Sequence, residues 1–214
     1  MLFRSYVTGS LTDVTFDVFA AEDIKAADGV SKDYYKADEK VGTITTDSNG
    51  IAQMDNLPAG KYYVKEVKTA HGYVLDGEPR YVDLSYRDQD TPVITYDEKW
   101  QNTRQKVKVT VLKKEKDTDR VLAGGVFGLY TSEDIKNVNG DVLLEKDSLI
   151  EQKATDEKGQ ITFAADLPVD GKYYVKENSA PDGFVTTEEV QEFTFEYAGE
   201  DQAEVSYDFT FENQ

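Results

Sequence analysis

The sequence GKYYVKE occurs twice in this chain of 214 residues, first at Gly60–Glu66 and again, 111 positions later, at Gly171–Glu177. The same displacement superposes Asn102 on Asn213. An identical run of seven residues that keeps its register with a distant landmark is the pattern of an internal repeat. The sequence therefore predicts two homologous domains.

Each repeat is expected to be an all-β domain. Apolar and polar residues alternate with a period of two, as at Val107, Val109 and Val111, and turn sequences such as Asn-Gly and Pro-Asp-Gly separate the alternating runs. Short alternating strands between turns are typical of sandwiches of about 100 residues. We expect two tandem antiparallel β-sandwich domains, at residues 1–103 and 104–214.

Two polar, acidic segments interrupt the strand pattern at matching places in the repeats. They are residues 21–40 and residues 132–148. We interpret both as long surface loops, the second with a helical turn after Ser132.

The composition argues against several classes of protein. With 42 acidic and 24 basic residues the formal charge is -18, which disfavours binding to nucleic acid or to an anionic membrane surface. Cysteine is absent, so disulfides, thiol nucleophiles and thiolate metal sites are excluded. No run of about 18 apolar residues predicts a membrane span, and any secretion signal or anchor is expected outside this segment.

Three polar residues fall on faces that the alternation predicts to be buried. The phase of Val107, Val109 and Val111 continues to Lys113, and the last strands of the repeat lead in the same way to Glu177 and Asn213. A strand-end lysine can also extend its amine to solvent, and alternation alone leaves that alternative open. Buried charges are costly unless they are paired, so we expect the three groups to meet.

The residues around these positions resemble a known family. The sequence VTVLKKEKDTDRVLAGGVFGLY at residues 109–130 is similar to the opening of Cna protein B-type domains of Gram-positive adhesins and pilins, and YYVKENSAPDGF at residues 173–184 resembles their E-box. The resemblance implies an immunoglobulin-like, prealbumin-type sandwich. It also implies that Lys113, Glu177 and Asn213 are the family's reactive lysine, its catalytic glutamate and its asparagine.

The reaction implied by the resemblance is an autocatalytic isopeptide bond. The Lys113 amine attacks the Asn213 carboxamide and ammonia leaves, with Glu177 polarising the amide and moving protons. An apolar core disfavours the ammonium form of lysine and the ionised form of a carboxyl group, which suits both roles. The protein acts once on itself, so no enzymatic activity towards a substrate, no cofactor and no metal are expected.

The first repeat has the glutamate and the asparagine but not the lysine. Glu66 and Asn102 are equivalent to Glu177 and Asn213, whereas the position of Lys113 falls on Leu2, and no lysine precedes Lys25. We expect an incomplete first strand and an unreacted Asn102.

The resemblance implies a structural function. We expect a stalk or pilin-type repeat of a Gram-positive cell-surface adhesin, extracellular and attached to the cell wall, whose partners are neighbouring domains of the same surface protein. The alternative is a binding module that contacts a host matrix protein or glycan through the loops at residues 21–40 or 132–148.

Other candidate sites receive simpler interpretations. Glu66 and Glu177 belong to different domains, which argues against a glycosidase acid pair. His71 is expected in a solvated turn, the acidic segment Asp47–Gly50 in a plain turn rather than a calcium loop, and Trp100 in core packing rather than ligand stacking.

Overall fold

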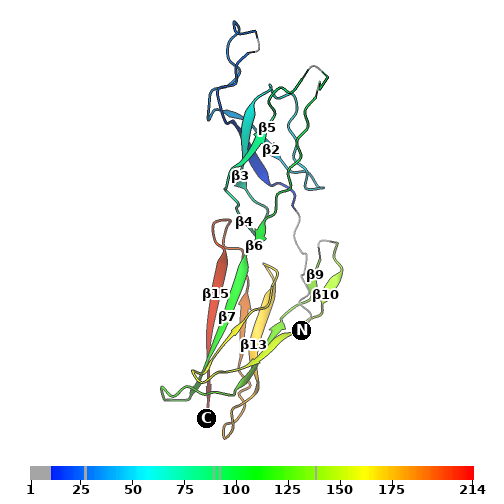
Figure 1. Cartoon of the computed structure of the whole chain (residues 1–214). Helices are drawn as coiled ribbons and strands as arrows, with labels where there is room; N and C mark the ends of the chain where they lie inside the picture. The colour runs from blue at the N-terminus through cyan, green and yellow to red at the C-terminus, as the bar shows by residue number, and fades with distance from the viewer. Residues whose placement is uncertain (1–10, 27, 89, 92, 138) are drawn as a thin grey trace. The chain divides into compact units, whose positions relative to one another are not determined.

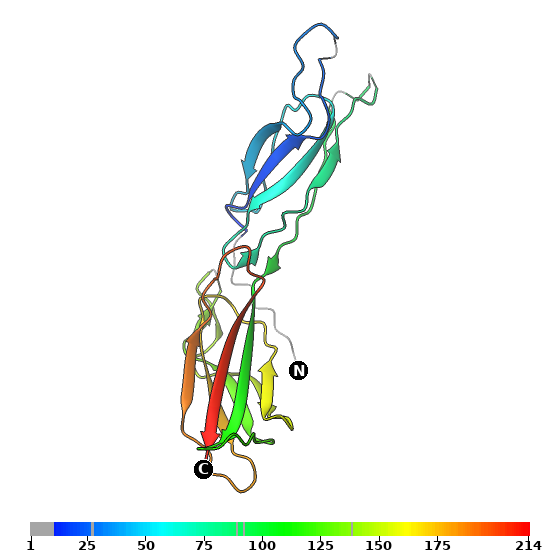
Figure 2. The ribbon, with the colours of Figure 1, turned by 90° about the vertical axis from the view of Figure 1, so that its left-hand side faces the viewer.

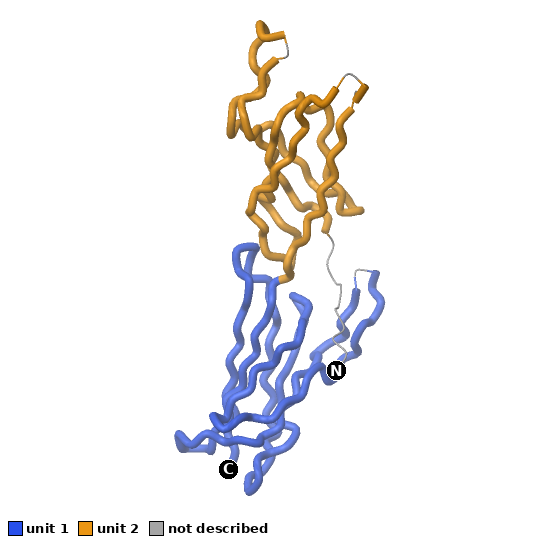
Figure 3. The backbone as a smooth tube through the Cα atoms, in the orientation of Figure 1, with its two compact units in different colours: residues 1–9, 105–214 blue, residues 10–104 orange. Residues whose placement is uncertain are grey.

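The computed structural model describes residues 11–26, 28–88, 90–91, 93–137 and 139–214, and these contain strands but no helix. They divide into two compact units, residues 11–104 and 105–214, here called the N-terminal and the C-terminal unit (Figure 3). Each unit is described separately below. The predicted all-β fold class is confirmed.

The C-terminal unit is a sandwich of two sheets. One sheet has the strand order β11-β8-β13-β14 and the other the order β12-β7-β15. Its strands are β7 (Lys106–Glu115), β8 (Val126–Thr131), β9 (Ile135–Lys136), β10 (Val142–Leu144), β11 (Leu149–Ala154), β12 (Gln160–Phe163), β13 (Lys172–Ser179), β14 (Val190–Thr194) and β15 (Glu204–Asn213).

One buried core lies between these sheets. The inward residues of β7 come from the predicted phase, and they pack with inward residues of β8 and β13. Aromatic rings fill much of the space, since Phe127 and Phe211 have ring centroids 5.0 Å apart. The buried members are Val107, Val109, Val111, Phe127, Leu129, Ile135, Ile161, Phe163, Leu167, Tyr173, Val175, Phe193, Phe195 and Phe211.

The first and last strands of this unit lie side by side and run parallel (Figure 1, Figure 2). The expectation of purely antiparallel sheets is wrong at this pair, although every other pair among the described strands is antiparallel. Parallel strands need a long connection, and here the other seven strands of the unit provide it. The parallel register aligns Phe211 with Lys113 and Asn213 with Glu115.

The N-terminal unit repeats one of the two sheets. Its four-stranded sheet has the order β2-β1-β3-β5, which corresponds strand by strand to β11-β8-β13-β14. A short β4–β6 pair accompanies it. The strands are β1 (Thr15–Ala20), β2 (Lys40–Thr45), β3 (Lys61–Lys68), β4 (Tyr73–Val74), β5 (Arg80–Asp83) and β6 (Thr103–Arg104).

A counterpart of the sheet β12-β7-β15 is absent from the described residues of the N-terminal unit. Residues 49–54 and 93–102, which correspond to β12 and β15 in the repeat, form no strand there. The core is accordingly divided into two smaller clusters, one around Val18 and Tyr62 and one around Val14 and Phe16.

The two predicted loops differ in structure. Residues 132–148 contain the hairpin β9–β10, so the helical turn predicted after Ser132 is wrong. The Asn137 side chain accepts the backbone N–H groups of Asn139 and Asp141, both at 2.9 Å, and this favours a turn over a helix. Residues 21–39, by contrast, have no regular strand, although Ile24 is buried and pairs with Tyr35.

Candidate functional site

Strand β7 carries Lys113 into the core of the C-terminal unit. Because side chains alternate along a strand, Lys113 shares the inward face of Val111, and its exposed fraction is 0%. Its backbone N–H donates to Gly159 O at 2.8 Å, and its carbonyl accepts from Leu122 N at 2.9 Å. A Cβ on Gly159, whose φ is +68°, would lie 2.7 Å from Lys113 O, so the close approach requires glycine.

Asn213 and Glu177 approach Lys113 from two directions. Asn213 lies opposite Glu115, which makes it a diagonal neighbour of Lys113 on the same face of one sheet. Glu177 comes from β13 in the facing sheet, where it lies opposite Phe127. The exposed fractions of Glu177 and Asn213 are 4% and 2%. The structure thus brings the three predicted residues together between the sheets.

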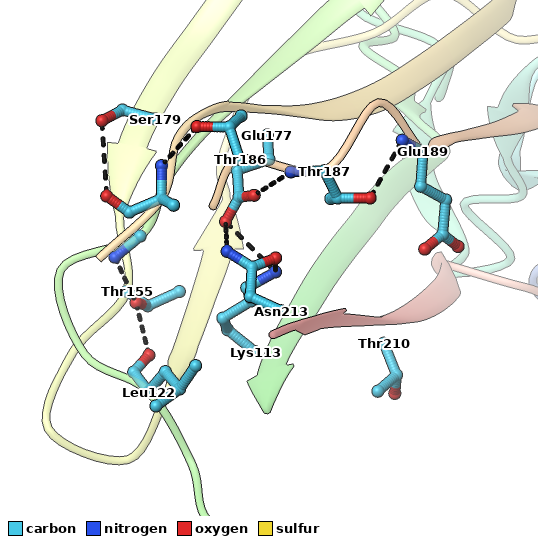
Figure 4. Close-up of polar contacts among 12 residues, drawn as sticks. Lys113, Leu122, Thr155, Glu177, Ser179, Thr186, Thr187, Glu189, Thr210 and Asn213 are labelled. Atoms are coloured by element: carbon cyan, nitrogen blue, oxygen red, sulfur yellow. Dashed lines mark hydrogen bonds and ion pairs between the residues drawn. The ribbon is translucent and has the colours of Figure 1, made fainter. Parts of the chain in front are cut away.

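One carboxylate oxygen contacts both nitrogen atoms of the cluster (Figure 4). Glu177 Oε1 lies 3.1 Å from Lys113 Nζ and accepts a hydrogen bond of 3.1 Å from Asn213 Nδ2. Lys113 Nζ also donates to Asn213 Oδ1. The second oxygen, Glu177 Oε2, accepts the backbone N–H of Thr187 at 2.8 Å. This last contact holds the carboxyl group in place.

The surroundings of the amine are apolar. The ring centroid of Phe127 lies 5.6 Å from Lys113 Nζ. Desolvation by burial lowers the pKa of Lys113, and this effect outweighs the opposing effects of Glu177, Glu189 and Glu212. The neutral amine, which is the nucleophilic form, is therefore favoured relative to a lysine in water.

The N-terminal unit contains the corresponding carboxyl and carboxamide groups. Glu66 has an exposed fraction of 1%, and its Oε1 accepts a hydrogen bond of 2.7 Å from Asn102 Nδ2. Its Oε2 accepts the backbone N–H of Asp76 at 2.7 Å. Within the described part of the chain no lysine or arginine pairs with Glu66. Leu2, the position equivalent to Lys113, lies outside the described residues.

Two contacts at these sites were not predicted from the sequence. The backbone N–H that binds Oε2 belongs to the tenth residue after the glutamate in both units, Thr187 and Asp76, and a backbone donor leaves no trace in residue identity. The other is Thr69, which replaces the E-box alanine Ala180 and whose hydroxyl lies 3.0 Å from Asn102 Nδ2. The departure of Thr69 from the E-box pattern was a visible clue.

Trp100 packs in the N-terminal unit, as expected. Its ring meets Phe16 edge-on with centroids 5.0 Å apart, in the place that Phe211 and Phe127 occupy in the other unit. The guanidinium of Arg80 lies 3.9 Å from the centroid of the Trp100 ring. Arg80 also binds Glu98, which ties the end of the unit to β5.

The remaining candidates have structural explanations. Glu66 and Glu177 each bind the asparagine of their own unit. His71 is exposed in a turn, and Asp47 caps its own turn by accepting the N–H groups of Asn49 and Ile51. The described residues include no cluster of three metal-ligating side chains. They also include no helix that could cross a membrane.

Comparison with protein families identifies the class. The SpaA family, described as a prealbumin-like fold domain, matches residues 5–100 and again residues 107–210. The chain therefore belongs to this family, in two tandem copies, and the predicted resemblance to pilin-type domains is confirmed. A comparison with curated proteins finds no match.

Solved structures share the fold. The Bacillus anthracis TIE protein is 24% identical with a TM-score of 0.62, and the match covers 98% of this chain but 32% of that one. The shaft pilin SpaA of Lactobacillus rhamnosus GG is 16% identical over 95% of this chain and 87% of the pilin, with a TM-score of 0.37. A C-terminal fragment of the pilus adhesin SpaC from the same organism is 17% identical over 96% and 90%, with a TM-score of 0.44.

Proposed function

We propose that this chain is a structural stalk segment of a pilin-type surface protein, and that its C-terminal unit cross-links itself through an isopeptide bond between Lys113 and Asn213. The observation that carries the proposal is the contact of one buried oxygen, Glu177 Oε1, with both Lys113 Nζ and Asn213 Nδ2 at 3.1 Å. A single group can therefore take a proton from the nucleophile and give it to the leaving nitrogen.

The proposed reaction balances without any added reagent. The proton of Lys113 moves to Glu177 Oε1, and the neutral amine attacks Cγ of Asn213. Glu177 returns the proton to Nδ2, the Cγ–Nδ2 bond breaks, and ammonia leaves as the Nζ–Cγ amide remains. The fixed positions of the three side chains replace a bimolecular encounter, which is a large part of the barrier to amide exchange.

The position of the bond suits a protein under tension. Lys113 lies near the end of β7 and Asn213 at the end of β15, the first and last strands of the unit. Tension that enters along β7 would cross to β15 through the new amide. Residues 114–212 would then carry none of it, so the sandwich would not be unfolded by pulling.

The setting that fits this function is extracellular. A bond of this kind stabilises by closing a long loop, as a disulfide does, but it resists reduction, and the chain has no cysteine. We place the protein on the cell wall of a Gram-positive bacterium, with neighbouring domains of the same surface protein as its partners. Family membership and the SpaA-type fold support this placement.

Intact mass under denaturing conditions tests the proposal. The folded wild-type protein should weigh one ammonia less than its sequence, and peptide mapping should find a branched peptide that joins Lys113 to Asn213. The Glu177→Gln variant should recover the full mass. Glu66→Gln is the matched control, since it changes the equivalent residue of the other unit and should leave the deficit unchanged.

A further inference from the structure

The N-terminal unit has room for a strand at the place where β7 lies in its homologue. In the C-terminal unit β7 is the central strand and bonds β12 on one side and β15 on the other. Among the described residues of the N-terminal unit, the segments equivalent to β12 and β15 bond no strand between them. Tyr96 has an exposed fraction of 46%, whereas its equivalent Tyr207 packs against the core.

Two polar groups face this place without a complete set of partners. In the C-terminal unit the oxygen of Asn213 accepts from Lys113, but no described residue donates to Oδ1 of Asn102. The indole Nε1–H of Trp100 is buried and has no acceptor in the described part of the chain. A strand beside residues 93–102 would bring backbone carbonyl groups to this region and an amine to Asn102.

The chemistry of the half-site selects the side chain that such a strand must carry. Glu66 and Asn102 have the same hydrogen bond, and the same backbone support, as Glu177 and Asn213. They lack only the amine. An arginine cannot replace it, because the guanidinium remains protonated and is a poor nucleophile.

We propose that the N-terminal unit accepts a lysine-bearing β-strand from a separate polypeptide and joins it covalently to Asn102. The strand would add beside residues 93–102 with apolar residues facing inward at alternate positions, as Val107, Val109 and Val111 do in β7. Its lysine would attack Cγ of Asn102, Glu66 would pass the proton to Nδ2, and ammonia would leave. The amide chemistry is that proposed for the C-terminal unit, but here it links two chains.

A peptide copy of β7 is the natural probe. We would incubate the intact protein with an N-acetylated peptide of residues 106–115 that retains only the lysine equivalent to Lys113, the other lysines being replaced as Lys106→Arg, Lys108→Arg and Lys114→Arg. The protein mass should rise by the peptide minus one ammonia, and mapping should place the new amide on Asn102. The Glu66→Gln variant should react at least about a hundredfold more slowly.

Docking can be measured apart from the chemistry. Trp100 is the only tryptophan of the chain and lies in the acceptor unit, so its fluorescence should change when the strand adds. A peptide with Lys113→Arg, or an Asn102→Ala protein, should show this change without any covalent product. Equal addition to the Asn102→Ala variant would overturn the assignment of the acceptor.

Two outcomes would overturn the proposal. One is the absence of both the fluorescence change and the mass increase with the lysine peptide. The other is a fluorescence change without an amide on Asn102 in the wild-type protein. Neither outcome affects the bond proposed in the C-terminal unit, because that bond is read from the mass of the protein before the peptide is added.

Discussion

The stabilisation from the cross-link in the C-terminal unit can be calculated from the positions that it joins. Lys113 and Asn213 are separated by 100 residues. Closing a loop of that length is expected to stabilise the folded unit by about 4.7 kcal/mol on the chain-entropy estimate. For a unit of about 110 residues, with an unfolding entropy of about 2.1 cal/mol/K per residue, this corresponds to a rise in Tm of about 20 °C.

Two variants separate the cross-link from the buried charge. Lys113→Met removes the amine and keeps an apolar side chain of similar length, so it should lose the loop-closure contribution alone. Glu177→Gln also prevents the bond but leaves the Lys113 amine buried without its carboxylate partner. It should therefore be the less stable of the two.

Calorimetry combined with tryptophan fluorescence would measure these effects. Trp100 reports the N-terminal unit, so the transition that fluorescence does not follow belongs to the C-terminal unit. Wild-type protein should unfold there about 20 °C above Lys113→Met. A wild-type protein of full sequence mass would refute the chemistry, and a wild-type protein lacking one ammonia but no more stable than Lys113→Met would refute the loop-closure argument.

Three further results are expected. In Glu177→Gln, burial keeps the pKa of Lys113 below that of the unfolded chain, so the unfolded state binds more protons between the two values, and urea midpoints should rise with pH by up to about 1.4 kcal/mol per pH unit, a slope that Glu177→Gln combined with Lys113→Met should lack. Gly159→Ala should destabilise the C-terminal unit by at least twice the roughly 1 kcal/mol expected for Gly140→Ala, which has an equally unusual φ but no atom within 4 Å of the new Cβ, and equal urea midpoints would contradict this. Mapping of wild-type protein alone should recover Asn102 as an unmodified residue, and a total deficit of two ammonias would show the opposite.

Local patterns predicted most of the C-terminal unit. Alternation along β7, β13 and β15 identified the buried faces, because side chains that point to one side of a strand recur at every second residue. The presence of polar residues on those faces at Lys113, Glu177 and Asn213 was therefore readable before any contact was known. The repeat likewise showed that the first domain has a glutamate and an asparagine but no matching lysine.

Other features had no pattern to reveal them. Residues 132–148 are polar throughout, and the Asn137 turn that makes them a hairpin depends on side-chain to backbone bonds that many acidic loops could form. The N–H groups of Thr187 and Asp76 hold the two glutamates in place, but a backbone donor can belong to any residue except proline.

The sequence by itself determined which residues point inward, where the repeats correspond and which groups could react, since these properties depend on spacing along one strand. Only the tertiary structure decided that β15 runs parallel to β7 in a register that places Asn213 diagonally beside Lys113, with Glu177 reaching both from the facing sheet. The physical reason is distance along the chain. Alternation specifies a face, but the partner and register of strands 100 residues apart follow from how the whole sandwich packs.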